Sequence, residues 1–218
     1  MQMVKNALGR MVPSEVNGRA VKPFEGAFAD MVSGKRKAAP PIPRCFPGRI
    51  DKVVNSLDGV LDRLPLRDGM CISFHHHLRN GDYLVNMVIE KLARRGFKDI
   101  VLAPTALFPV HDKLIPYIES GVISHVEGSM NGDVGRACSY GKMKKTATLR
   151  SHGGRVRAVQ DGDLHIDVAF IGASAADCYG NANGVLGKSA CGPLSYSNVD
   201  SLYADYSVVI TDNLVPFP

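Results

Sequence analysis

Residues 71–82 read CISFHHHLRNGD and join a short apolar strand to a strongly apolar helix. The apolar part, 70–74, has the length of a buried strand, and residues 83–93 repeat apolar side chains at helical spacing. Three histidines, an arginine and Asn-Gly-Asp fill the loop between them. In α/β proteins, anions and acyl oxygens are commonly held where a strand leads into a helix N-terminus. The stretch therefore predicts an α/β fold and marks a candidate site.

Strand-like and helix-like segments alternate along the rest of the chain. Further strands are predicted at 100–103, 122–126, 168–171 and 207–211, a short strand at 146–149, and helices at 50–64, 110–120 and 196–203. The stretch 128–145, rich in glycine and lysine, shows no clear pattern. Short strands that are apolar on both faces and separated by helices predict an open, mostly parallel sheet with helices on both faces.

Length and composition limit the class of protein. The 218 residues are enough for one large domain, and no apolar run has the roughly 18 residues of a membrane span. The N-terminus lacks the apolar stretch of a signal peptide. Five scattered cysteines without a C-x-x-C pair indicate reduced thiols and a cytoplasmic location. A net charge of +5 suits small anionic substrates as well as a mild affinity for nucleic acid, and decides neither.

The chain divides unevenly into an arm and a domain. Residues 1–47 contain a basic run and a proline-rich stretch, which predict an N-terminal arm that is partly extended. Residues 48–218 carry the α/β pattern. Because the sequence stops just past its last core strand, we expect it to be part of a longer chain.

The polar loop after the first strand admits three interpretations. His75 and His77 would share one face of an extended segment, as metal ligands do, but no carboxylate or thiol is placed to complete a set, so no metal is expected. A solvated loop with Asp82 as helix N-cap is the plain alternative. We favour an anion or acyl-thioester site, because three histidines and an arginine are unusual in a passive loop. Its candidate residues are His75, His76, His77, Arg79, Asn80 and Gly81.

A second cluster, GASAADCYGNANG at 172–184, follows the strand at 168–171. The small residues Gly172 and Ala173 would let a ligand approach the backbone. The polar side chains of Asp177, Asn181 and Asn183 suit ligand contacts, and they also suit tight turns, so a plain turn cluster is the alternative.

A near match to a phosphate-binding loop lies within residues 182–189. Its context is wrong, because the preceding strand ends about ten residues earlier and Gly192-Pro193 blocks the helix that should follow. Nucleotide hydrolysis is therefore not expected.

A third segment, RSHGGRVR at 150–157, combines two glycines with three arginines. Free backbone amides and positive charge make His152 and Gly153 candidate anion contacts, although a basic exposed turn is equally consistent. A nucleic-acid patch with the lysines of 142–145 lacks interleaved aromatic residues. The chain has no G-x-S-x-G elbow and no convincing pairing of nucleophile and base. The residues alone thus indicate anion-binding loops without an evident catalytic group.

Several motifs together resemble a known family. These are ISFHHHLRNGDY at 72–83, SHGGR at 151–155, IDVAF at 166–170, DCYGNANG at 177–184 and VITDNLVP at 209–216. They resemble the alpha subunit of citrate lyase, its citrate CoA-transferase component, from about Leu8 to the C-terminus. More broadly, the chain is similar to family I CoA-transferases, in which each half has a CoA-transferase-like α/β fold and the Asp-x-x-Gly-Asn turn recurs.

The resemblance implies a specific reaction. The alpha subunit exchanges acetate for citrate on the dephospho-CoA-type thiol of an acyl carrier subunit, and the beta subunit then cleaves the citryl-thioester. The resemblance implies that residues 48–218 are the first half of a longer, two-domain enzyme. The attacking glutamate belongs to the second half of the family chain, so no catalytic residue is expected here and this sequence should be inactive alone. No tightly bound cofactor is implied, because CoA or the acyl-carrier thioester is a substrate. The implied partners are citrate, the acetyl-thioester, the beta and gamma subunits and a second copy of the chain, without nucleic acid or membrane.

The resemblance also suggests roles for the candidate residues. The loop 75–81 would stabilise the oxyanion that forms when a thioester is attacked. Arg79 or the histidines would neutralise citrate carboxylates, and Asn181 and Asn183 would position the pantetheine arm or the carboxylates. Two other hypotheses stay open: a non-catalytic α/β binding module for a small anionic ligand or CoA, and a scaffold that assembles a complex through the arm 1–47.

Overall fold

The computed structural model describes residues 2–26, 29, 52–75 and 80–218, in two compact units, Met1–Ala38 and Ala39–Pro218. In the first unit, β1 (Met3–Lys5) pairs antiparallel with β2 (Met11–Pro13), and β3 (Glu15–Val16) pairs with β4 (Arg19–Ala20). The proline-rich part of the predicted arm, and its boundary at residue 47, lie outside the described residues.

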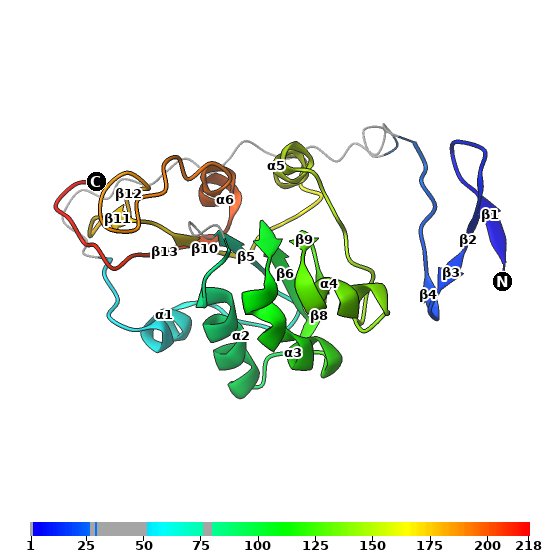
Figure 1. Ribbon diagram of the computed structural model, residues 1–218, viewed down its shortest axis with the longest axis horizontal. Coiled ribbons are helices and arrows are strands. Elements are labelled where there is room, and N and C mark those ends of the chain that lie inside the picture. Colours follow the sequence, from blue (N-terminus) through cyan, green and yellow to red (C-terminus); the bar gives the residue numbers. More distant parts are fainter. Residues whose placement is uncertain (1, 27–28, 30–51, 76–79) are drawn as a thin grey trace. The chain divides into compact units, whose positions relative to one another are not determined.

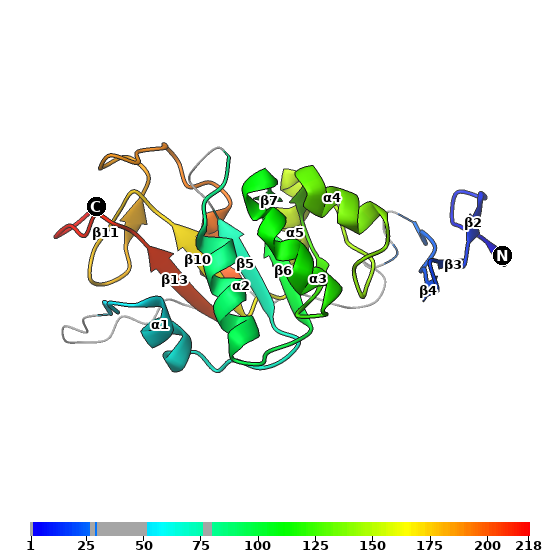
Figure 2. The ribbon, with the colours of Figure 1, turned by 60° about the horizontal axis from the view of Figure 1, so that its bottom comes forward.

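The second unit is built around a parallel sheet of five strands (Figures 1 and 2). The strands are β5 (Cys71–His75), β6 (Ile100–Pro104), β8 (Ile123–Val126), β10 (Val168–Gly172) and β13 (Tyr206–Ile210). Their order in the sheet is β13-β10-β5-β6-β8, and every neighbouring pair is parallel. Short ladders join β7 (Ala106–Leu107) to β9 (Ser129–Met130) and β11 (Ala175–Ala176) to β12 (Ala182–Asn183). The predicted parallel sheet is confirmed.

Helices cover both faces of this sheet, as predicted (Figure 1). On one face lie α1 (Leu57–Arg63), α2 (Leu84–Arg94), the 3₁₀ helix η2 (Pro109–Leu114), α3 (Ile115–Glu119) and α4 (Gly132–Ser139). On the other face lie α5 (His152–Asp161) and α6 (Ser197–Tyr203).

Alternation along β5 decides which side chains face which layer. Phe74 belongs to the larger core and stacks on Phe170 of β10, with ring centroids 5.3 Å apart. Cys71 packs on the opposite face, in the core that includes Ala158 of α5. Because strand side chains alternate, Ser73 shares the face of Cys71, under α5 and α6. A polar residue is thus buried between the sheet and these two helices.

Two of the predicted helices differ in extent from those observed. The helix expected over 50–64 begins only at Leu57, because the Ser56 hydroxyl accepts the amide of Gly59 as an N-cap. Before it, the amide of Lys52 donates to the carbonyl of Cys178, so residues 52–55 continue the apolar spacing without being helical. The segment 110–120 is split into η2 and α3, with Pro116 in the first turn of α3, where its missing N–H costs no hydrogen bond.

Two other predictions were wrong in kind. The strand expected at 146–149 is reduced to a single bridge between Thr148 and Glu127. The segment 150–157, interpreted as a glycine-rich loop or exposed turn, instead forms most of α5. The Ser151 hydroxyl caps this helix by accepting the amide of Gly154 at 3.1 Å, and the cap outweighs the low helix propensity of the two glycines.

None of the described helices is long and apolar enough to cross a membrane. Four cysteines fall within the described residues, and all four are free thiols. Burial raises the pKa of the Cys71 thiol strongly, and nearby Asp167 adds to the effect, so this thiol stays protonated and unreactive.

Candidate functional site

The strand order creates a switch point at the centre of the sheet. From β5 the chain continues through β6 to β8 on one side, whereas β10 and β13 lie on the other. In open α/β sheets, ligands bind outside the carboxyl ends of the strands where the order reverses. Here those ends are His75 of β5 and Gly172 of β10. Both were candidate residues in the sequence.

Asp200 of α6 is the centre of a buried hydrogen-bonded cluster at this switch point. Its Oδ1 and Oδ2 accept Nη1 and Nη2 of Arg155, each at 2.8 Å. Oδ2 also accepts the Ser73 hydroxyl and, at 2.7 Å, Nε2 of His75. Nη2 of Arg155 further donates to the Ser73 hydroxyl and to the Ala103 carbonyl. The pair of Asp200 and Arg155 thus ties together β5, β6, α5 and α6.

The cluster fixes the charge state of Asp200 and the orientation of His75. Burial raises the pKa of the Asp200 carboxyl, but hydrogen bonds from Arg155 and His75 outweigh it and hold that pKa well below its usual range. An ionised carboxylate can only accept hydrogen bonds, so Nε2 of His75 carries a proton and donates it. The imidazole is therefore held in one orientation at the end of β5.

Acid is expected to weaken the fold through Asp200. Its folded-state pKa lies below its unfolded-state pKa, so the unfolded chain binds more protons and stability rises with pH in this range. The contribution is complete above the ordinary Asp pKa of about 3.9 and is lost as the pH falls below it toward the folded-state pKa. Urea unfolding at stepped pH measures the loss, which should be smaller in Asp200→Asn. An equal loss in the variant would contradict the assignment.

Two adjoining cavities open at this end of the sheet. One, of about 140 Å³, is lined by His75, Thr105, Gly172, Cys191 and residues 193–197. The other, of about 150 Å³, is lined by Thr105, Gly128, Ser129, residues 150–152, Arg155 and Tyr196. Thr105 and Tyr196 belong to both, so we name the pair the twin cavity and its halves the His75 side and the Arg155 side.

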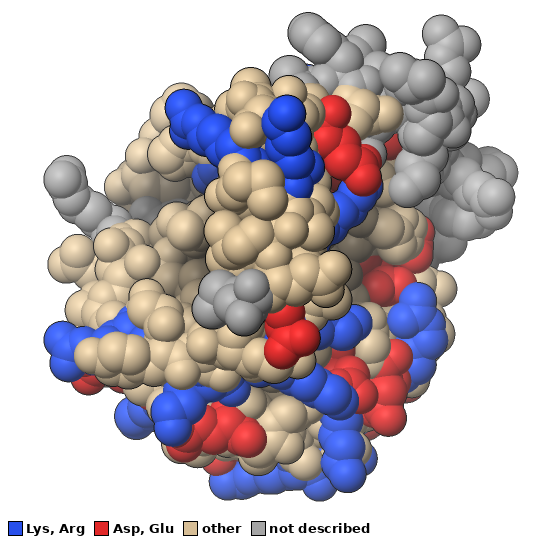
Figure 3. Space-filling view, turned by 90° about the vertical axis from the view of Figure 1, so that its right-hand side faces the viewer, with Lys and Arg blue, Asp and Glu red and all other residues tan. Residues whose placement is uncertain are grey.

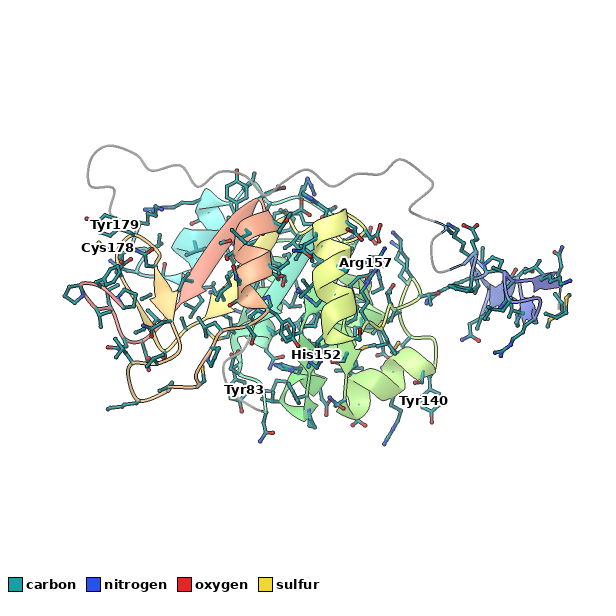
Figure 4. All side chains as sticks on the ribbon, turned by 90° about the horizontal axis from the view of Figure 1, so that it is seen from above. Tyr83, Tyr140, His152, Arg157, Cys178 and Tyr179 are labelled. Carbon is teal, nitrogen blue, oxygen red and sulfur yellow. The ribbon has the colours of Figure 1, made fainter. Side chains whose placement is uncertain are left out.

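The Arg155 side lies at the start of α5, where Figure 4 shows His152. The His152 ring stacks on the ring of Tyr196, with centroids 4.9 Å apart and planes 11° from parallel. Gly128 forms another part of the wall and lies so close to Pro104 that a Cβ would come within 2.2 Å of its carbonyl oxygen, so only glycine fits. The walls therefore combine a helix N-terminus, aromatic rings and closely packed backbone.

The structure brings some of the predicted site residues together and not others. His75 and Gly172 line one side of the twin cavity, and His152 lines the other. Gly153 is in the first turn of α5, and Ala173 donates its amide to Ile210 at the end of β13. His76, His77 and Arg79 lie outside the described residues.

The last residues of the polar loop, 80–82, have a structural role. Gly81 has a φ of 81°, and a Cβ there would lie 2.6 Å from Cε1 of His111. Asn80 is exposed. Asp82, expected as an N-cap, accepts the amide of Leu84 at 2.8 Å, one residue before the assigned cap position.

Within the cluster 172–184, Gly172 lines the twin cavity, whereas the polar residues from 177 onward form a separate turn. The Asp177 carboxylate accepts the amides of Tyr179 and Asn181, and the Asn181 side chain donates to its other oxygen at 2.7 Å. Asn183 accepts the amide of Val185. These bonds build a turn, and Figure 4 shows Cys178 and Tyr179 well apart from His152. The structure gives the three polar side chains a turn-forming role, and their predicted ligand contacts stay predictions.

The basic residues between 142 and 157 are largely matched by acidic partners. Lys142 pairs with Glu119, Lys144 with Asp99, Arg150 with Glu127, Arg155 with Asp200 and Arg157 with Asp161. Figure 3 likewise shows Lys and Arg side chains interspersed with Asp and Glu on the face it draws. Such pairing neutralises most of the charge that a polyanion would need.

Sequence reasoning missed the residues that organise the site. Asp200 lies in a weakly patterned helix, and no local signal marks it. Ser73 gave a usable signal, because a polar residue inside an otherwise apolar strand needs a buried partner. Arg155 was recognised only as part of a basic segment, although its side chain is buried and structural.

The family model described as "Citrate lyase, alpha subunit (CitF)" matches residues 50–218. This chain belongs to that family. The resemblance found in the sequence motifs is therefore confirmed for the whole of the described α/β unit.

Curated relatives agree with the family assignment. The citrate lyase alpha chain of Haemophilus influenzae is 43% identical over 168 residues, which are 77% of this chain and 34% of that relative. The Klebsiella pneumoniae chain of the same description is 45% identical over 168 residues, 77% of this chain and 33% of that relative. This chain thus spans about a third of the length of the relatives it matches.

A solved structure from Streptococcus mutans, described as an alpha subunit of citrate lyase in complex with citrate, is similar in sequence and fold. It is 45% identical, with a TM-score of 0.78, over 85% of this chain and 36% of that one. The decarboxylase AibA/AibB variant is 15% identical with a TM-score of 0.52, over 73% of this chain and 74% of that one, and shows a shared fold alone. The predicted α/β architecture is confirmed.

Proposed function

We propose that the twin cavity binds citrate as part of a CoA-transfer reaction. The observation that carries the proposal is the position of this cavity, at the switch point of a sheet shared with a citrate-bound relative. Its walls combine the first turn of α5, whose amides suit a carboxylate, with Arg155 and with His75, whose ring Asp200 holds at the edge of the cavity.

The proposed reaction exchanges one acyl group for another on a thiol. Citrate and the acetyl-thioester of an acyl carrier give the citryl-thioester and free acetate. A glutamate carboxylate would attack the thioester carbonyl and form an acyl anhydride, with the carrier thiolate as leaving group. No glutamate lies among the described residues that line either side of the twin cavity, so we propose that this group comes from outside them.

The chain's own donors would act on the charge that develops at the thioester carbonyl. Preorganised N–H groups near such an oxygen lower the barrier by about 3–4 kcal/mol each. The first amides of α5 are the leading candidates, because they have no acceptor within the described residues. His75 lies at the edge of the cavity with its Nε2 donating to Asp200, so we assign it the positioning of citrate rather than the oxyanion contact. The acyl carrier thioester, the beta and gamma subunits and a second copy of the chain are the proposed partners, in a reducing cytoplasm that suits the four free thiols.

Calorimetric titration of citrate into this chain tests the proposal. We expect saturable binding of one citrate per chain, with acetate binding much more weakly. His75→Gln should weaken citrate binding by about tenfold, because the amide replaces the ring with a different donor geometry. The matched control is His165→Gln, whose ring pairs with Asp205 on the surface at the opposite ends of the strands and should bind citrate normally.

An absence of binding heat with citrate at high protein concentration would contradict the proposal. Equal weakening by both histidine variants would also count against it, because it would show that the effect does not come from the switch point. Citrate binding without any thioester exchange in the assembled complex would instead favour a non-catalytic module that binds anions.

A further inference from the structure

Arg155, which lines one side of the twin cavity, carries a buried donor that has no acceptor within the described residues. Arg155 is 4% exposed, and its two terminal nitrogens are used by Asp200, Ser73 and Ala103. Its Nε is buried and meets no hydrogen-bond partner within the described part of the chain. A buried N–H without an acceptor is unfavourable, so an acceptor that enters this side of the cavity would be stabilised by it.

The start of α5 adds further donors at the same place. Ser151 and His152 line the cavity, and the Ser151 hydroxyl caps the helix by accepting the amide of Gly154. Within the described residues, the amides of His152 and Gly153 have no acceptor, as is usual for the first turn of a helix. A Cβ placed on Gly153 would meet nothing within 4 Å, so the space above this turn is open. The positive end of a ten-residue helix therefore faces open space beside Arg155.

The groups that line this side suit a small anion, because they include hydrogen-bond donors and no carboxylate. Its described lining includes Arg150, His152 and Arg155 and no carboxylate. Arg150 is paired with Glu127 and Arg155 with Asp200, so both arginines are neutralised and neither carboxylate is left unpaired. A volume of about 150 Å³ suits a carboxylate group better than a nucleotide diphosphate.

We propose that the Arg155 side is a carboxylate subsite, in which Arg155 Nε and the first amides of α5 hold one carboxylate of a polycarboxylate. This inference rests on the proposed function, because the rest of the molecule would occupy the His75 side across the shared walls, Thr105 and Tyr196. The subsite would then determine specificity: a tricarboxylate can reach both sides at once, whereas acetate can occupy only one. Arg155 becomes both an anchor of the buried cluster and a contact for substrate.

Two substitutions of one residue isolate the charge effect. Ser151→Asp and Ser151→Asn both retain a side-chain oxygen that can cap α5, so the two variants should melt at similar temperatures. The variants differ by one negative charge at the cavity wall. We expect citrate to bind Ser151→Asp at least about tenfold more weakly than Ser151→Asn, because the added charge repels the carboxylate. Equal affinities of the two variants would overturn the subsite.

Nitrogen-15 NMR of the unmodified chain separates this inference from the proposed function. With citrate, we expect the Arg155 Nε–H signal and the amides of His152 and Gly153 to shift together. If citrate shifts only signals around His75 and Gly172, the subsite is wrong and the proposed function stands. If formate shifts the three α5 signals while citrate shifts none, the proposed function is wrong and the carboxylate subsite stands. If citrate moves no signal anywhere in the chain and formate does not move these three, both fail.

Discussion

Replacing Asp200 by Asn is expected to lower the free energy of unfolding by about 3–5 kcal/mol. The substitution keeps the size of the side chain but removes the charge that Arg155 faces. The guanidinium would then be buried without a counterion, while Ser73 and His75 would lose the acceptor they share. Urea unfolding at neutral pH measures the change.

Asp205→Asn is the matched control, because Asp205 also pairs with a histidine but lies on the surface. Its loss should be about 0–1 kcal/mol, as for other exposed ion pairs. A double variant, Asp200→Leu with Arg155→Met, should recover part of the stability, because both buried charges disappear together. A loss below about 1 kcal/mol for Asp200→Asn would show that the buried cluster around Asp200 does not stabilise the fold as expected.

Arg155→Lys is expected to weaken citrate binding by at least about tenfold while leaving the positive charge in place. Lysine has a single nitrogen, which cannot engage both oxygens of Asp200, the Ser73 hydroxyl and the Ala103 carbonyl together. It also lacks the Nε–H, which is the donor of Arg155 that has no acceptor within the described residues. Calorimetry gives the affinity, and thermal unfolding separates binding from stability.

Arg157→Lys provides the control on the same helix (Figure 4). Its side chain is exposed and pairs with Asp161 one helical turn further on, so lysine should replace it with little effect on either measurement. If Arg155→Lys destabilises the chain but binds citrate as the unmodified chain does, Arg155 has only a structural role and the carboxylate subsite is wrong.

The sheet could be predicted because its strands are short, apolar on both faces and separated by helices. The strand predicted at 70–74 is observed at Cys71–His75, and the one at 168–171 is observed at Val168–Gly172. Helix extents were less predictable. The apolar spacing that begins at Ile50 continues through residues that are not helical, and the Ser56 cap, rather than periodicity, sets the start of α1.

The place of the candidate site in the fold could be predicted, whereas the residues that build it could be predicted only in part. The exit from β5 was identified because a dense polar run follows an apolar strand, and His75 does lie at the switch point. The cluster around Asp200 depends on contacts between residues 45 to 127 positions apart, which no local pattern encodes. The helical state of SHGGR was missed because two glycines suggested a loop, although the serine before them is a good N-cap.

A crystal structure of this chain grown with citrate tests the central claim most directly. We expect citrate density in the twin cavity, with one carboxylate beside Arg155 and the start of α5 and the remainder toward His75. Density for citrate at the Asp177–Asn181 turn instead, or an empty twin cavity at saturating citrate, would contradict the claim that the switch point of this sheet is where the chain recognises its substrate.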